Sequence, residues 1–267
     1  MIRKLILVSA TFVVLHAVAA HAFFCIEWRQ GSCVYWPDSR TTMLAFLGSP
    51  GTSLINGTQT WDENAFAAAN DWNAVGAIQF TVDNGDNFLD PCGAQNHQSH
   101  ICDNTGALGD NPIFFASTFC GNAFGDVIEL TNNCWDSVSG RMLNAPVFVN
   151  ANVLWNAYDG PLRFSNGQPI YDARRVLLHE LGHVLGLDHP DAHAQTVQAI
   201  MNSRVSNIDR LQADDINGAR AIYASASGST IGTSGCQVRA RRGGGAVLPL
   251  LLGWIILACQ RRRLRRA

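Results

Sequence analysis

One stretch of eleven residues, positions 179–189, holds the side chains best suited to chemistry. It reads H-E-L-G-H-V-L-G-L-D-H. Side chains four positions apart on a helix project from the same face, so His179 and His183 can reach one metal ion. Gly186 can take the left-handed conformation that ends a helix and reverses the chain. Such a turn would bring His189 back as a third ligand.

This ligand set predicts a catalytic zinc site. Three imidazole nitrogens leave one position of a tetrahedral zinc open, whereas a structural zinc usually has four protein ligands. Zinc lowers the pKa of a bound water towards about 7. Glu180 directly follows the first histidine and is placed to take that proton as general base and pass it to a leaving amine. The sequence therefore predicts hydrolysis of an amide bond by a zinc-activated water, without a nucleophilic side chain.

The full H-E-x-x-H-x-x-G-x-x-H pattern resembles the signature of the metzincin metallopeptidases. Metzincins have a methionine turn after the third histidine, and the segment A-I-M-N at positions 199–202 follows here. The resemblance implies that Met201 lies beneath the metal. Residues 211–223 resemble the closing helix of the matrixin branch. In matrixins an aspartate pair at this place, here Asp214 and Asp215, supports the methionine turn and the N-terminus; helix capping is the alternative explanation.

The resemblance covers residues 33–224 and implies an α+β fold. That fold is a metzincin-type catalytic domain with a twisted mixed sheet, a long first helix, an active-site helix, a glycine turn before the third zinc ligand, the methionine turn and a C-terminal helix. The residues themselves indicate a helix at 60–75, with Thr60 and Glu63 as a capping box. Asp172 is expected to cap the active-site helix. Strands are expected at 78–82, 113–116, 125–130 and 146–150.

By resemblance, strand 113–116 is expected to be the edge strand above the cleft. An exposed edge binds an extended peptide through backbone hydrogen bonds, which makes Phe114, Phe115 and Ala116 candidate substrate contacts. After the methionine this chain has N-S-R-V where matrixins have Pro-x-Tyr, and Pro190 replaces the serine common after the third histidine. The family therefore implies no particular specificity for this chain.

The two ends of the chain differ in composition from the region between them. Residues 1–22 have a basic start, an apolar run and an A-H-A cleavage site, which predicts a secretory signal peptide. An uncleaved N-terminal anchor is the alternative. Residues 23–224 are the predicted catalytic domain, followed by a flexible linker at 225–242.

Residues 243–267 contain a glycine triplet, an apolar stretch and an arginine cluster. This tail resembles the glycine–hydrophobic–arginine sorting tails of Gram-negative exported proteins. Residues 246–260 would serve either as a permanent membrane anchor or as part of a tail cut near the glycines. The protein is therefore expected to be exported, and to be periplasmic, on the cell surface or secreted.

The charges are segregated along the chain. Residues 23–235 hold all 21 acidic residues and only nine arginines, a net charge of −12 within a whole-chain value of −2. Such a domain would repel phosphates, which argues against a nucleic-acid partner. A protein or peptide substrate is the expected partner, and the domain is expected to be a monomer.

Six cysteines fall within the predicted catalytic domain, and an even number in an exported domain favours disulfides. Pairing of sequence neighbours would give 25–33, 92–102 and 120–134. A second zinc site is the competing interpretation, but no C-x-x-C spacing supports it. Residues 83–111 read as a long polar loop that holds either a calcium ion, with unassigned ligands, or solvent alone. His97 and His100 in this loop depart from the matrixin H-x-D pattern for a structural zinc.

The sequence as a whole predicts a zinc metalloendopeptidase acting on extracellular or periplasmic proteins. One alternative is a non-enzymatic surface or adhesion module stabilised by zinc. Glu180 argues against it, because a structural site has no need of that carboxylate. A zinc hydrolase of a cell-wall amide is the other alternative. No propeptide or cysteine-switch sequence is recognised, so the control of latency stays open.

Overall fold

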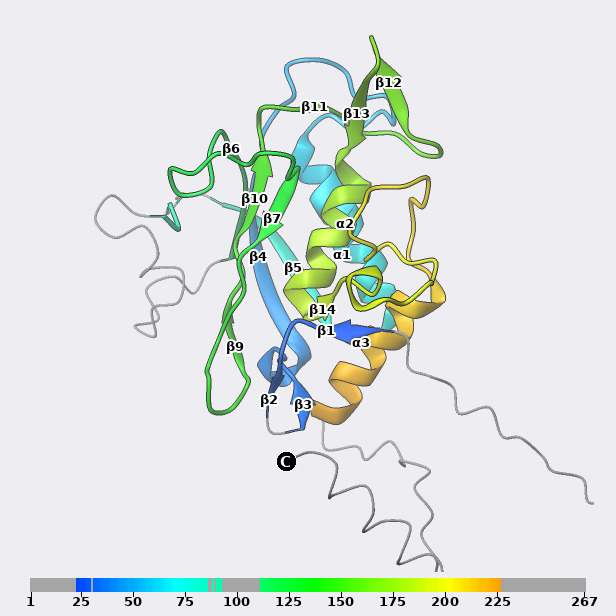
Figure 1. Cartoon of the computed structure of the whole chain (residues 1–267). Helices are drawn as coiled ribbons and strands as arrows, with labels where there is room; N and C mark the ends of the chain where they lie inside the picture. The colour runs from blue at the N-terminus through cyan, green and yellow to red at the C-terminus, as the bar shows by residue number, and fades with distance from the viewer. Residues whose placement is uncertain (1–22, 30, 86–87, 89, 93–110, 227–267) are drawn as a thin grey trace, which may run out of the picture. The chain divides into compact units, whose positions relative to one another are not determined.

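The computed structural model describes residues 23–29, 31–85, 88, 90–92 and 111–226 (Figure 1). They belong to the first of two units into which the chain divides, Met1–Ile231, while the second is Gly232–Ala267. The predicted signal peptide, the sorting tail and most of the polar loop lie outside the described residues. Within the described ranges, no helix combines the length and the apolar character needed to cross a membrane.

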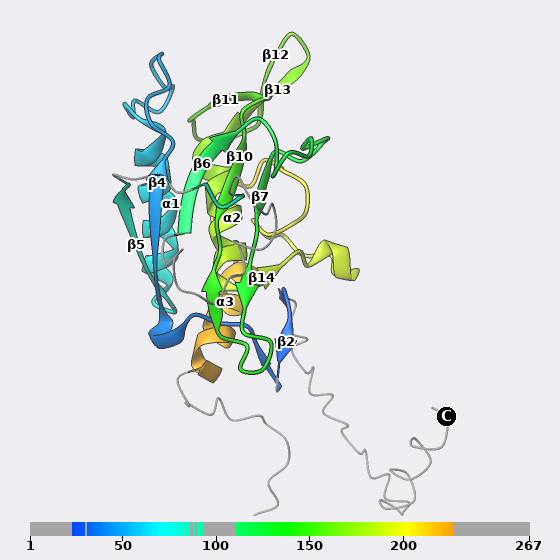
Figure 2. The same ribbon diagram turned by 90° about the vertical axis from the view of Figure 1, so that its left-hand side faces the viewer.

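Five strands form the main sheet, in the order β5-β4-β6-β10-β7 (Figure 2). Strands β5, β4, β6 and β10 are parallel to one another, and β7 is antiparallel to β10. The predicted mixed sheet is therefore confirmed. Its strands are β4 (Arg40–Phe46), β5 (Gln79–Asn84), β6 (Asn111–Ala116), β7 (Glu129–Thr131) and β10 (Val147–Asn150).

Two helices, α1 (Trp61–Val75) and α2 (Ala173–Leu185), pack against each other on one side of this sheet (Figure 1). The indole of Trp72 on α1 donates a hydrogen bond to the carbonyl of Leu178 on α2 at 2.9 Å. A third helix, α3 (Ala213–Ala226), contacts both. Its Tyr223 hydroxyl donates to the carbonyl of Leu185, so it satisfies one of the carbonyls left open at the end of α2.

The ends of α1 follow directly from the sequence. The Thr60 side chain accepts from the backbone N–H of Glu63 at 3.2 Å, and the Glu63 carboxylate accepts from the N–H of Gln59 at 3.0 Å. Two N–H groups at the start of the helix are thereby satisfied. Gly76, with φ of 74°, ends the helix in the left-handed conformation.

The ends of α2 position the candidate site, because this helix carries His179, Glu180 and His183. Asp172 caps its start by accepting from the N–H of Arg175 at 3.3 Å. Gly186 ends it with φ of 114°, and a Cβ there would lie 2.8 Å from the carbonyl oxygen of Val34. Glycine is needed for both the conformation and the space. The chain then forms β14 (Leu187–Asp188), which pairs with β1 (Phe24–Cys25).

The remaining elements are short and lie around these layers. A second sheet has the order β11-β13-β12 and leads directly into α2. The short elements are β2 (Trp28–Arg29), β3 (Ser32–Cys33), η1 (Pro37–Ser39), β8 (Cys134–Trp135), β9 (Met142–Asn144), β11 (Leu154–Asn156), β12 (Arg163–Ser165), β13 (Gln168–Asp172) and η2 (Asp191–His193).

The prediction that residues 113–116 form an edge strand is wrong. β6 lies inside the sheet between β4 and β10, and the strand that ends the sheet on the side of α2 is β7. Both segments are short and apolar enough to be strands. Their order is set by long-range pairing, which the local sequence does not encode.

Two of the three predicted disulfides are also wrong. Cys25–Cys33 is formed as predicted, but Cys92 pairs with Cys120, with their Cα atoms 5.1 Å apart. This excludes the pairings 92–102 and 120–134, although Cys134 is itself disulfide-bonded. Cys92 and Cys120 meet beside an aromatic cluster on β6 and β10, so packing across the sheet decided their pairing.

Candidate metal and catalytic site

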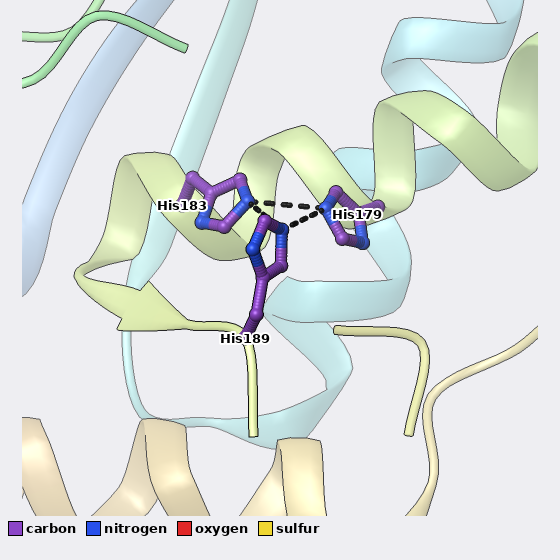
Figure 3. Close-up of side chains that lie close together, drawn as sticks. All are labelled: His179, His183 and His189. Carbon is purple, nitrogen blue, oxygen red and sulfur yellow. Dashed lines mark hydrogen bonds between the residues drawn. The ribbon is translucent and has the colours of Figure 1, made fainter. Parts of the chain in front are cut away.

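Three imidazoles meet at the end of α2, as the sequence predicted (Figure 3). The Nε2 atoms of His179, His183 and His189 are 3.0–3.1 Å apart. Ligand atoms about 2.0–2.1 Å from a tetrahedral zinc would be about 3.3 Å apart, so the observed spacing fits a shared zinc ion. Among the described residues, this is the one group of three or more candidate ligands close enough to hold a metal.

Two of the three rings are held by their other nitrogen atom. Nδ1 of His179 lies 2.7 Å from the carbonyl oxygen of Ile200, and Nδ1 of His183 lies 2.8 Å from that of Leu187. A ring nitrogen that donates to a carbonyl carries the proton, which leaves Nε2 unprotonated and able to bind a metal. Burial, reinforced by His179 and His189, holds the pKa of His183 well below its usual value and favours this neutral form.

Glu180 lies on the same helix, and the residue as a whole is 4% exposed. Burial raises the pKa of Glu180, while the neighbouring His179 and hydrogen bonds from Thr131 lower it. Glu180 and the histidines line one cleft of about 480 Å³. The cleft also borders β7 and the chain after Met201; its other lining residues include Ile128, Glu129, Leu130, Thr131, Arg175, Val176, Asn202, Ser203, Arg204 and Val205.

The segment at Met201 lies directly against α2. Its side chain is buried at 1% exposure, and a Cβ on Gly182 would be only 2.2 Å from the Met201 sulfur. Gly182 therefore allows the methionine to pack on the turn of α2 that lies between the two histidines. This placement is the one expected of a methionine turn.

Asp215 holds this turn from α3. Its carboxylate accepts from the backbone N–H groups of Ile200 at 2.9 Å and Met201 at 3.2 Å, and from that of Gln212 at 2.7 Å. The carboxylate of Asp214, in contrast, forms no hydrogen bond with another described residue. Within the pair the support of the methionine turn thus belongs to Asp215, which goes beyond helix capping.

Two residues of β7 were missed by the sequence reasoning. The hydroxyl of Thr131 lies 2.7 Å from Oε2 of Glu180. Glu129 is 6% exposed, and its Oε2 has no hydrogen-bond partner among the described residues. Burial, with Glu180 nearby, raises the pKa of Glu129 well above its usual value. A lone glutamate within a predicted strand was the available signal, since acidic residues are depleted in strands.

Arg175 was missed as well. It is buried at 2% exposure, it lines the cleft, and it donates to the carbonyls of Ser206 and Gly160. Nε of Arg175 lies 3.6 Å from the carboxylate of Asp172. The guanidinium therefore ties the loop at 206 to the start of α2.

The predicted substrate contacts on β6 do not reach this cleft. Phe114, Phe115 and Ala116 line a different hollow of about 470 Å³, together with Phe88 and the Cys92–Cys120 disulfide. The place that was assigned to them beside the histidines is taken by β7. His97 and His100 lie outside the described residues.

Residues 15–224 match the profile of one protein family, Peptidase_M10, described as matrixin. A search of curated protein sequences gave no match. Among solved structures, one titled "GM1 bound form of the ECX AB5 holotoxin" aligns with 14% sequence identity and a TM-score of 0.42, covering 76% of this chain and 89% of that one. A superposition this loose adds nothing to the assignment of the site.

Proposed function

We propose that this chain, which belongs to the matrixin family and is a zinc metallopeptidase, is an endopeptidase that cleaves exported or extracellular proteins. The observation that supports the site assignment is the convergence of three Nε2 atoms within 3.1 Å of one another beside a buried glutamate in an open cleft. A structural zinc would instead be closed by a fourth protein ligand.

In this proposal His179, His183 and His189 hold the zinc. When bound, zinc supplies a Lewis acid that activates water and polarises the scissile carbonyl. Glu180 takes the proton from the attacking water and delivers it to the leaving amine. Its burial suits this role, because a raised pKa lets the carboxyl hold a proton between the two transfers.

The substrate backbone is proposed to bind along β7. Among the described strands, β7 pairs with β10 alone, and its residues line the cleft that holds the histidines. An extended peptide can add to such an edge through main-chain hydrogen bonds. β7 therefore takes the role that the sequence had suggested for residues 113–116.

The disulfides support a location outside the cytoplasm. Cys25–Cys33 and Cys92–Cys120 are typical of proteins that fold in an oxidising environment. Family membership favours a peptide substrate over both an adhesion module and a cell-wall amide hydrolase. The signal peptide at 1–22, the domain and linker boundaries, the anchor at 246–260, the monomeric state and a calcium ion stay predictions from the sequence.

The test is hydrolysis of a quenched-fluorescent peptide library by the purified full chain, with and without a zinc chelator. We expect cleavage that stops on chelation and returns with added zinc. Glu180→Ala should retain zinc and lose activity by about 10²–10⁴-fold, since it removes the general base.

Asp83→Ala is the matched control, because it removes an exposed carboxylate from β5 at the far edge of the sheet. It should leave the rate unchanged. A folded, zinc-loaded wild-type chain that cleaves no peptide would refute the endopeptidase proposal. A Glu180→Ala variant as active as wild type would refute the role of Glu180 alone.

A further inference from the structure

One face of β7 is directed towards α2. Thr131 stands opposite Val147 on β10, and Val147 is buried in the main core with the residues of α2. The intervening Leu130 stands opposite Phe148, which belongs to the separate aromatic cluster on the other face of the sheet. Because side chains alternate along a strand, Thr131 faces the active-site helix.

On that face the Thr131 hydroxyl has two oxygen atoms of Glu180 within reach. Oε2 of the carboxylate lies 2.7 Å away and the backbone carbonyl oxygen 3.2 Å away. A hydroxyl has one hydrogen to donate, and the shorter contact is also the one to the charged acceptor. The hydrogen therefore goes to Oε2.

The carboxylate needs such a partner. Rotation about the last torsion of a glutamate side chain is broad, so packing alone does not fix which oxygen faces the cleft. A general base must place one oxygen within hydrogen-bond reach of the proton that it abstracts. A donor that occupies Oε2 leaves Oε1 as the oxygen that can meet the water.

We propose that Thr131 is a positioning residue for Glu180. The Thr131 hydroxyl on β7 donates a hydrogen bond to the Glu180 carboxylate and so orients it for proton transfer. The inference rests on the proposed function. It joins the strand that binds the substrate backbone to the residue that moves the proton, across 49 positions of sequence. A substrate strand pairing with β7 would then meet a carboxylate already oriented by that same strand.

The competing explanation is that Thr131 only packs between sheet and helix. Two substitutions separate these roles. Thr131→Val keeps the shape of the side chain and removes the donor, while Thr131→Ser keeps the donor and removes a methyl group. If Thr131 acts through packing, the valine variant should stay closer to wild type in kcat. If Thr131 acts through its hydroxyl, the serine variant should.

The experiment measures kcat and KM of the full chain on one fluorogenic peptide, together with zinc content and thermal unfolding. We expect Thr131→Val to lower kcat by about 10- to 100-fold with KM within about 3-fold of wild type, because a hydrogen bond to a charged group is lost from the proton-transfer step. Thr131→Ser should keep kcat within about 3-fold. Thr81→Val, at an exposed position of β5, is the matched control and should change neither constant.

A second comparison tests the link to Glu180 itself. In a Glu180→Ala background, Thr131→Val should have no further effect on the residual rate, since the group that it positions is absent. Thr131→Ala replaces the valine variant should that protein fail to fold, with the same expectation.

Three results would overturn the inference: an unchanged kcat in Thr131→Val, an equal loss in Thr131→Ser, or a loss of kcat that merely follows a loss of zinc. These outcomes are distinct from failure of the proposed function. If the proposed function were wrong, the wild-type chain itself would cleave no peptide.

Discussion

Replacing Asp215 by asparagine should loosen the methionine turn and, through it, one zinc ligand. The path is short. Asp215 accepts from the N–H groups of Ile200 and Met201, and the carbonyl oxygen of that same Ile200 lies 2.7 Å from Nδ1 of His179. A buried carboxylate on α3 thus fixes the backbone that fixes the first histidine.

The size of the effect follows from what asparagine keeps. Its one carbonyl oxygen can replace Oδ2, which accepts from Ile200 and Gln212, while its NH₂ group at the other position faces the N–H of Met201. One charge-assisted hydrogen bond, about 1.5–3 kcal/mol, is lost and two are weakened. Burial raises the pKa of Asp215, which means that the charged carboxylate is costly to bury; the neutral asparagine avoids this cost, and that offsets part of the loss. We expect a net loss of about 2 kcal/mol, or about 4–8 °C in Tm.

Zinc binding should weaken too. Partners that orient a metal-binding histidine are typically worth about 10–100-fold in metal affinity, and an indirect loss should fall near 10-fold. The assay is thermal unfolding with zinc present, followed by zinc competition against a chromogenic chelator. Asp214→Asn is the control, because the adjacent carboxylate forms no hydrogen bond within the described ranges. An Asp215→Asn protein that matches this control in both Tm and zinc affinity would refute the reasoning.

Two further substitutions test the packing and the charge of the site. Gly182→Ala would place its methyl group 2.2 Å from the buried sulfur of Met201. Overpacking costs about 1–3 kcal/mol, against about 1 kcal/mol gained in helix propensity, so urea unfolding should show a net loss; a gain in stability would contradict this packing. Glu129→Gln should have a higher free energy of unfolding than wild type, and this difference should grow as pH rises from about 5 to about 8. Burial raises the pKa of Glu129 in the folded chain, so the unfolded chain loses this proton first and wild-type stability falls with rising pH. A stability difference that is the same at both pH values would show that Glu129 does not carry this effect.

The H-E-x-x-H-x-x-G-x-x-H motif could be recognised from the sequence because its geometry is local. His179, Glu180 and His183 are placed by the helical repeat, and Gly186 and Asp172 set where that helix ends and begins. These interactions span at most a few residues. The same is true of the capping box at Thr60, and of the Cys25–Cys33 pair that closes a short loop.

The surroundings of the motif were decided by the tertiary structure. The order of the strands put β7, not β6, beside the active-site helix, and the same folding brought Cys92 to Cys120. Thr131 meets Glu180 across 49 positions, and Asp215 meets Ile200 across 15.

Physically, the division follows the range of the interactions. Side-chain periodicity and caps are fixed by neighbouring backbone geometry, so residue types and spacing determined the positions of the three histidines, Glu180 and the turn between them. The pairing of strands and the burial of carboxylates instead depend on which segments, distant in the sequence, pack together and exclude water. The sequence therefore predicted the histidines and Glu180, whereas the residues that hydrogen-bond to this group were decided only by the packing of β7 and α3 against α2.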